Sequence, residues 1–278
     1  MEVAALVLAA SAIAIAVAAG PAVGAEGVPP SAEAGLERLR GKSVFFGHQS
    51  VGMNVLDGLQ LLAARSGKEL RITEVRPGTA IAPGTIGHAW VGENHAPSTK
   101  IDAFVRAVDA LPAPGVDVAL VKLCYVDFAP ETDVAAILAR YRAALDDLRR
   151  RHPHTTFVHV TAPVSTVQGG AKALLKQVMG KPPYGLVENV RREEYNQALR
   201  KAYGGKEPIF DLARIESTAP DGRVETVEWQ GRRVPALVPA YTDDGGHLNE
   251  AGRLRAAAAL VDLLAGLPDA PGAGAATT

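Results

Sequence analysis

A serine and a histidine–aspartate pair are the side chains in this sequence best suited to act together in nucleophilic chemistry. Ser50 closely follows the apolar run 43–46 and opens a stretch with helical spacing. At a helix N-terminus, backbone N–H groups favour negative charge developing near the hydroxyl. His247 lies three residues after Asp244, so the carboxylate reaches back to orient the imidazole. The three residues predict a Ser-His-Asp site, although Ser50 taken alone would more often be a helix cap.

The elements that must position these residues alternate between strand and helix. Apolar or alternating runs predict strands at 43–46, 70–75, 116–125, 157–160 and 208–212. Helical spacing predicts helices over 54–66, 101–111, 133–152, 192–203 and 249–264. Such alternation is typical of a parallel sheet with helices on both faces. Residues 223–229 and 232–238 flank Gln230-Gly231 and predict a hairpin inserted before the last helix. We predict one domain over residues 42–267.

Ligands of open parallel sheets bind at the carboxyl ends of the strands. The segments expected there are 47–52, 124–127 and 243–249. Within them, Tyr125 and Asp127 are candidate substrate contacts. His48 either lines the same pocket or packs beside Phe46. The long segment 164–188 is of the kind that forms lids or binding surfaces.

Composition excludes several classes of protein. The chain has 278 residues, 47% of them hydrophobic, with 29 Lys and Arg against 30 Asp and Glu. A net charge of −1 gives no overall reason to bind nucleic acid or an anionic membrane. Cys124 is the single cysteine, so no internal disulfide forms, and no Cys-x-x-Cys pair is present to hold zinc. We expect neither a metal nor a cofactor.

The two ends of the chain have the composition of processing segments and tails. An apolar run over 3–19 precedes small residues at 23–25, which predicts a signal peptide over residues 1–25 and a secreted or periplasmic protein. The alternatives are an uncleaved anchor or a misplaced start; if cleavage occurs, we expect no stable membrane insertion. Residues 26–41 are expected to be a linker and 268–278 a disordered tail.

The order of these residues resembles the SGNH/GDSL hydrolase superfamily. A serine follows the first strand and an Asp-x-x-His motif precedes the last helix of an alternating α/β chain. The resemblance covers most of residues 42–266. It implies a flavodoxin-like, three-layer α/β/α sandwich and a metal-independent esterase or deacetylase. It also implies that Ser50 is the nucleophile, His247 the general base and Asp244 the orienting acid.

The oxyanion hole of that superfamily matches this sequence only in part. It uses the N–H of the nucleophile, a glycine after the second strand and an asparagine after the third. Gly92 matches the glycine best, with Gly84 and Gly87 as competitors. Val126 stands where the asparagine is expected, and Asn94 is a candidate replacement donor. Loss of one such donor can cost about 2.7–4 kcal/mol of transition-state stabilisation.

The sequence therefore predicts a secreted serine hydrolase that cleaves a carboxylic ester, with small esters or O-acyl groups on saccharides as substrates. One alternative is a non-catalytic carbohydrate-binding or accessory protein that keeps the fold. Another is an O-acyltransferase, in which a sugar hydroxyl replaces water. A nucleotide or flavin binder is disfavoured, because neither Gly-x-Gly-x-x-Gly nor a P-loop motif is present.

Overall fold

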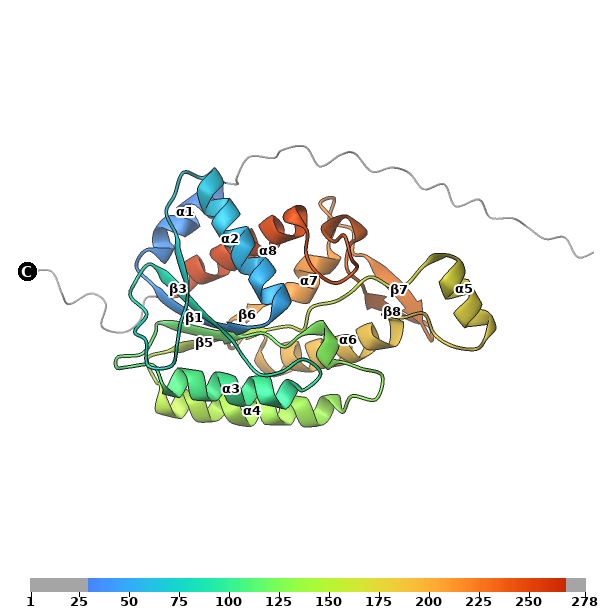
Figure 1. Ribbon diagram of the computed structural model, residues 1–278, viewed down its shortest axis with the longest axis horizontal. Helices are drawn as coiled ribbons and strands as arrows, with labels where there is room; N and C mark the ends of the chain where they lie inside the picture. The colour runs from blue at the N-terminus through green and yellow to red at the C-terminus, as the bar shows by residue number, and fades with distance from the viewer. Residues whose placement is uncertain (1–29, 269–278) are drawn as a thin grey trace, which may run out of the picture.

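The computed structural model describes residues 30–268 and has a six-stranded sheet at its centre (Figure 1). Every neighbouring pair of strands in this sheet is parallel. The spatial order is β2-β3-β1-β4-β5-β6. The strands are β1 (Ser43–His48), β2 (Arg71–Glu74), β3 (Thr85–Trp90), β4 (Val118–Val121), β5 (Thr156–Val160) and β6 (Ile209–Phe210).

The strand order reverses at β1. With the edge strand β2 set aside, the other strands follow the flavodoxin-like order, in which the first strand lies between the second and the third. The chain passes from β1 to the edge strand β2, returns to β3 beside β1, and then crosses to β4, on the other side of β1. The carboxyl ends of β1 and β4 are therefore neighbours at the switch point, where such sheets bind ligands. Ser50 follows β1 and Tyr125 follows β4.

Helices cover both faces of the sheet, as Figure 1 shows. On one face lie α1 (Pro30–Leu39), α2 (Ser50–Arg65), α7 (Leu212–Ser217) and α8 (Glu250–Gly266). On the other lie α3 (Pro97–Asp109), α4 (Val134–Arg151) and α6 (Leu186–Tyr203). Successive residues of β1 point to opposite faces of the sheet. Val44 and Phe46 pack in the core on the α2 and α8 side, and Phe45 packs in the core on the α3 and α4 side. The three-layer α/β/α sandwich predicted from the sequence is confirmed.

Strand β3 was not expected from the sequence. Its run, Thr85–Trp90, includes a glycine and a histidine that interrupt the apolar pattern. Ile81 packs closely on Gly87, since a Cβ at this position would lie 2.5 Å from Cδ1 of Ile81. His88 pairs in register with Phe46 of β1, and its side chain is buried. The strand is thus specified by long-range contacts and not by its own hydrophobicity.

The expected linker over residues 26–41 is corrected by helix α1. This helix occupies Pro30–Leu39 and packs against α8. Leu36 and Leu39 belong to the core on that face, and a Cβ at Gly35 would lie 2.5 Å from Cγ1 of Val261. The expected signal peptide, and the expected tail from residue 269 onward, lie outside the described residues.

Three further elements surround the central sandwich. The predicted hairpin is present as β7 (Thr226–Trp229) and β8 (Arg232–Pro235), which pair antiparallel. Helix α5 (Gly170–Val178), not expected from the sequence, lies in the 164–188 segment, and the short helices η1 (Tyr125–Asp127) and η2 (Pro239–Tyr241) follow β4 and β8. Among residues 30–268, no helix combines the length and the hydrophobicity that crossing a bilayer requires.

Candidate active site

Ser50 is the first residue of α2 and lies just beyond the carboxyl end of β1. The N-cap position belongs to Gln49, so Ser50 does not have the capping role that a serine most often has at a helix start. The Gln49 side chain instead donates from Nε2 to the carbonyl oxygens of Val91 and Gly92, at 3.0 and 2.9 Å. Ser50 is half-buried, and its Oγ forms no hydrogen bond within residues 30–268. The hydroxyl is therefore available to a ligand.

His247 is held by Asp244 through the turn that separates them. Oδ2 of Asp244 lies 2.6 Å from Nδ1 of His247, and Oδ1 accepts from the backbone N–H groups of Gly246 and His247 at 2.9 and 2.8 Å. Partial burial raises the pKa of Asp244, but these hydrogen bonds outweigh burial and hold the pKa well below its usual range. An ionised carboxylate on Nδ1 fixes the tautomer that leaves Nε2 free to accept a proton.

A third side chain connects the helix of Ser50 to the turn of His247. Asn54 lies one helical turn after Ser50, on the same face of α2. Its Oδ1 accepts from the backbone N–H of Leu248 at 3.0 Å, and this contact is buried. Since Leu248 directly follows His247, the hydrogen bond keeps the start of α2 beside the Asp244–His247 turn.

The loop after β3 supplies the expected glycine. Gly92 has φ of +59°, and a Cβ there would lie 2.4 Å from the backbone nitrogen of Lys100. Only glycine fits this position without displacing α3. Gly84 precedes β3 and Gly87 lies within it, so Gly92 alone of the three follows the strand. The N–H groups of Ser50 and Gly92 donate to no acceptor in the described part of the chain.

Asn94, the candidate replacement donor, is exposed and oriented by a buried lysine. Its Oδ1 accepts from Nζ of Lys100 at 3.2 Å. That contact occupies the carbonyl side of the amide. Within residues 30–268, Nδ2 of Asn94 has no acceptor. The amide can therefore donate to an oxygen of a ligand.

Asp127, expected to contact substrate, is instead buried in the framework of this loop. Its side chain is fully covered and forms an ion pair with Lys100, with 2.5 Å between Nζ and Oδ1. Oδ1 also accepts from the N–H of His95 at 3.0 Å, and Oδ2 from the N–H of Cys124 at 2.7 Å. These contacts join the loop after β3 to the end of β4. The geometry gives Asp127 a positioning role.

Tyr125 lies next to the histidine, as a residue after β4 is expected to. The rings of Tyr125 and His247 meet edge-on, with centroids 5.7 Å apart. Gly246 allows this approach, because a Cβ there would lie 2.8 Å from Cζ of Tyr125. Burial and the charge of Asp244 raise the pKa of the Tyr125 phenol, so it remains a neutral hydrogen-bond donor at neutral pH.

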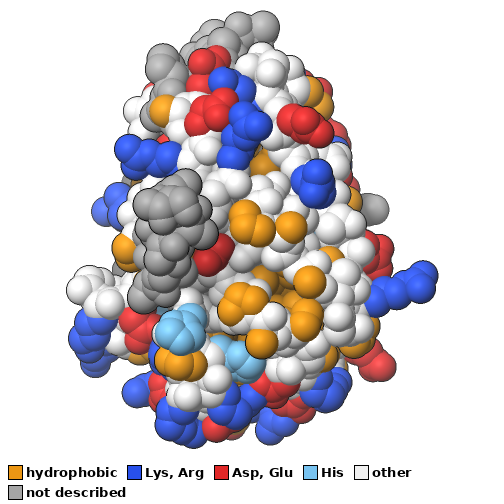
Figure 2. All heavy atoms as spheres, turned by 90° about the vertical axis from the view of Figure 1, so that its left-hand side faces the viewer, with side chains coloured by type: hydrophobic (Ala, Val, Ile, Leu, Met, Phe, Trp, Pro, Cys, Tyr) orange, Lys and Arg blue, Asp and Glu red, His pale blue; other side chains and the backbone are white. Residues whose placement is uncertain are grey.

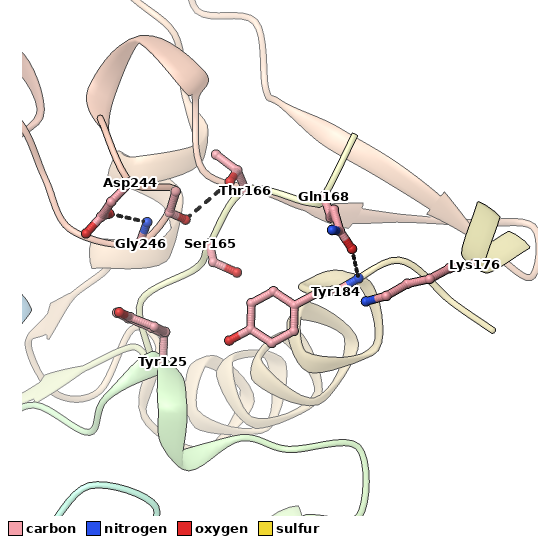
Figure 3. Close-up of a pocket in the computed structure, with 9 residues that line it drawn as sticks. Tyr125, Ser165, Thr166, Gln168, Lys176, Tyr184, Asp244 and Gly246 are labelled. Carbon is pink, nitrogen blue, oxygen red and sulfur yellow. Dashed lines mark hydrogen bonds between the residues drawn. The ribbon is translucent and has the colours of Figure 1, made fainter. Parts of the chain in front are cut away.

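A cavity of about 530 Å³ opens beside Tyr125. In Figure 3, the Tyr184 side chain extends toward Tyr125, and Tyr125 is directed toward the Asp244–Gly246 turn. Ser50 and His247 are not among the lining residues, so the cavity adjoins the candidate site through Tyr125 and Asp244. It is lined by Tyr125, Ser165, Thr166, Gln168, Lys176, Tyr184, Asp244, Gly245 and Gly246.

The buried side chain of Arg192 holds two of the residues that line this cavity. The sequence analysis did not predict this role. The side chain is 1% exposed; Nε donates to the carbonyl of Tyr125 at 2.9 Å and Nη1 to Oγ of Ser165 at 2.7 Å. Burial lowers the pKa of the guanidinium to about 10, which keeps it charged at neutral pH. A signal was present, since Arg192 shares the buried face of α6 with Tyr195 and Leu199. A charged residue on an apolar helix face indicates a buried polar network.

His48 packs in the core and does not line the cavity. It is fully buried, its ring lies 5.1 Å from that of Phe46, and Nε2 lies 3.0 Å from Nδ1 of His88. Burial, followed by the charges of His88 and Lys122, lowers the pKa of His48 to about 4. It is therefore a neutral structural residue at pH 7. The packing alternative of the sequence analysis is the one that the structure favours.

The single cysteine has a structural neighbour. Cys124 is buried, and Nζ of Lys122 lies 3.4 Å from its sulfur. Within residues 30–268, no group of three or more His, Cys, Asp or Glu side chains is arranged to hold a metal ion.

Comparison with known proteins found matches only among solved structures. No family model and no curated relative matches the chain. Solved structures that are similar include a Streptococcus pneumonia protein provisionally described as a platelet activating factor (16% identity, TM-score 0.47, covering 84% of this chain and 91% of that one). A GDSL-like lipase from Bacteroides thetaiotaomicron is 13% identical, with a TM-score of 0.46 and coverage of 81% and 86%. An acetyl xylan esterase is 15% identical, with a TM-score of 0.42 and coverage of 78% and 96%. The resemblance to the SGNH/GDSL hydrolase superfamily rests on the sequence motifs at Ser50 and at Asp244–His247.

Proposed function

We propose that the protein is a serine hydrolase that cleaves a carboxylic ester, with Ser50 as nucleophile, His247 as general base and Asp244 as orienting acid. One observation carries the proposal: the hydrogen-bonded Asp244–His247 pair lies on a turn that Asn54 ties to the helix that Ser50 begins. Asn54 is one helical turn from Ser50, and Leu248 is adjacent to His247. One buried hydrogen bond therefore holds the start of the Ser50 helix next to the Asp244–His247 turn.

In the acylation step, Oγ of Ser50 attacks the ester carbonyl carbon and its proton passes to Nε2 of His247. The carbonyl oxygen becomes an oxyanion, which accepts from the unpaired N–H groups of Ser50 and Gly92 and from Nδ2 of Asn94. The intermediate then collapses, the C–O bond to the alcohol breaks, and His247 returns its proton to the leaving alcohol. Asp244 stays ionised and stabilises the imidazolium.

In the second step, His247 takes a proton from water, and the resulting nucleophile attacks the acyl carbon bound to Ser50. Collapse of this second intermediate releases the carboxylic acid and returns the proton to Oγ of Ser50. A sugar hydroxyl in place of water would give an O-acyltransferase, and the mass of the product distinguishes the two. We further propose that the protein works outside the cytoplasm, on the basis of the apolar segment 3–19.

Labelling with a fluorophosphonate, read by intact mass, tests the proposal. We expect one adduct on the wild-type protein, none on Ser50→Ala and slowed labelling on His247→Ala. Ser66→Ala is the matched control, because Ser66 caps the far end of the same helix. An unlabelled but folded wild-type protein contradicts the proposal and favours the non-catalytic binding protein; retention of the adduct in Ser50→Ala assigns the nucleophile elsewhere.

A further inference from the structure

Four large hydrophobic side chains are exposed on α5 and the residue that follows it. Leu174, Leu175, Val178 and Met179 are 63%, 61%, 80% and 60% exposed. Figure 1 shows α5 projecting beyond the helical layers at one end of the molecule. A contiguous group of exposed apolar side chains on an otherwise well-packed protein marks a surface that associates with something.

The charged residues of the segment 165–187 have one sign. Residues 165–187 include Lys172, Lys176 and Lys181 and contain no Asp or Glu. Lys176 and Lys181 form no ion pair within the described residues, whereas Arg150 at the end of α4 pairs with Asp147 at 2.8 Å. Figure 2 shows the opposite end of the molecule, where charged side chains of both signs lie close to one another. The basic segment is therefore a local feature of a chain whose net charge is −1.

Exposed hydrophobic side chains combined with lysines indicate a particular kind of partner. A lipid bilayer with anionic headgroups takes the apolar side chains into the headgroup–acyl boundary and holds the lysines at its surface. Tyr184 lies in the same segment and is 56% exposed. Tyrosine is typical of the membrane interface, since its ring is apolar and its hydroxyl remains hydrated. Charge complementarity thus favours an anionic lipid surface over a neutral one.

The same segment borders the candidate active site. Lys176 and Tyr184 line the cavity that Asp244 and Gly246 also line. In Figure 3, the side chains of Lys176 and Tyr184 lie on one side of this cavity, and the Asp244–Gly246 turn lies on the other. A surface that receives α5 would therefore lie next to the mouth of the cavity.

We propose that α5, together with Met179, docks on an anionic lipid surface, and that the esters cleaved at Ser50 are amphiphiles taken from that surface. The docking stands on the exposed side chains and charges alone. The identity of the substrate rests on the proposed function, so the two are tested separately.

Docking is tested by flotation of the full-length protein with vesicles of phosphatidylcholine, with and without phosphatidylglycerol. We expect flotation with the anionic vesicles only, weakened by high salt. The double variant Leu175→Glu with Val178→Glu is expected to reduce flotation at least about tenfold, since two apolar contacts are replaced by repelled charges. Val224→Glu is the control, because Val224 is an exposed hydrophobic residue, 48% exposed, outside this segment.

Three results would overturn the docking proposal. These are no flotation of the wild-type protein, equal flotation with neutral vesicles, and undiminished flotation of the double variant. Self-association that the double variant abolishes, without vesicle binding, would assign α5 to an interface between copies of this chain. Because Ser50→Ala should float like the wild-type protein, a failure of the proposed catalytic function does not affect this result.

Substrate delivery is tested with two nitrophenyl esters, an acetate in water and a long-chain ester in anionic vesicles. The double variant is expected to lose about tenfold or more on the vesicle-borne ester and to retain its rate on the acetate. Equal rates of variant and wild type on both esters would overturn the delivery proposal. A wild-type protein that floats but hydrolyses neither ester would overturn the proposed function while leaving the docking surface in place.

Discussion

Oδ1 of Asn54 accepts a hydrogen bond from the backbone N–H of Leu248 at 3.0 Å, across 194 residues of sequence. This contact joins the helix that begins with Ser50 to the turn that carries His247. Both partners are buried, so the contact is shielded from competing water. The separation between the proposed nucleophile and the proposed base therefore depends on a side chain with no chemical role of its own.

We predict that Asn54→Ala lowers kcat by about tenfold to a hundredfold, since small displacements of reacting groups carry penalties of that order. The free energy of unfolding should fall by about 1–3 kcal/mol, because the N–H of Leu248 loses its acceptor. Asn54→Asp keeps an acceptor and should recover most of the kcat. Ester hydrolysis and urea unfolding measure the two effects. A wild-type kcat in Asn54→Ala would show that the junction does not position the site.

Gly92 and Gly67 form a matched pair for testing the loop after β3. Their φ angles are +59° and +61°, so an added side chain strains both backbones similarly. A Cβ at Gly67 meets no atom within 4 Å, whereas one at Gly92 lies 2.4 Å from the nitrogen of Lys100. We predict that Gly67→Ala costs about 1–2 kcal/mol of stability and leaves activity unchanged.

Gly92→Ala should cost more than Gly67→Ala and lower kcat at least about tenfold, because the loop that carries the N–H of Gly92 must move away from α3. Urea unfolding and ester hydrolysis of the two variants provide the comparison. Equal activities would remove Gly92 from the proposed oxyanion hole.

The Asp244 carboxylate is predicted to act by orienting His247. Asp244→Asn should lower kcat by about a hundredfold to ten-thousandfold, because an amide no longer selects the productive tautomer. Asp243→Asn is the neighbouring control; Asp243 contacts Nδ2 of Asn249 at 3.3 Å and not the histidine. Since the hydrogen bonds to Asp244 hold its pKa well below its usual range, the carboxylate does not titrate above pH 4.

The acid limb of the wild-type profile of kcat/KM above pH 4 should therefore have a slope of one, from a single titrating group. Stopped assays across this pH range measure it. A slope of two, or an Asp244→Asn enzyme as active as Asp243→Asn, would contradict the orienting role.

The sequence was sufficient to predict where the candidate residues in short motifs lie, namely at strand ends. Ser50 and the Asp244-x-x-His247 turn are local patterns, and alternating strands and helices place their segments at one edge of the sheet. Asn54 and Arg192 act through partners far away in the chain, at separations of 194 and 67 residues. No local pattern encodes such contacts, which is why these supporting residues were missed.

The same reason explains the differences in the fold. Strand β3 contains Gly87, on which Ile81 packs closely. Helix α1 was expected to be part of a linker, because its apolar residues pack on α8, which is far away in the sequence. Helix α5 was missed for the opposite reason. Its large hydrophobic residues are mostly exposed, so the usual link between apolar spacing and a buried face does not hold there.

The protonation state of the buried residue Glu216 in α7 can be tested through the pH dependence of stability. It is 1% exposed; Oε2 accepts from the N–H of Val164 at 2.8 Å, and Oε1 has no hydrogen-bond partner in the described part of the chain. Burial raises the pKa of Glu216 to about 8, against the lowering effects of that hydrogen bond and of Lys122 and Arg192. The carboxyl is therefore predominantly protonated at pH 7 in the folded protein and ionised in the unfolded chain.

A raised carboxyl pKa favours folding most strongly below the unfolded value of 4.5, and this contribution is lost as the pH rises toward about 8. We predict that the free energy of unfolding of the wild-type protein declines relative to that of Glu216→Gln by up to about 1.4 kcal/mol per pH unit across this window. Urea unfolding from pH 5 to pH 8 measures the difference, with the exposed Glu228→Gln as control. A Glu216→Gln variant that is less stable than wild type by the same amount at every pH would contradict this prediction. It would mean that the carboxylate is ionised and balances the buried charge of Lys122, because removing one of two opposite buried charges leaves the other uncompensated.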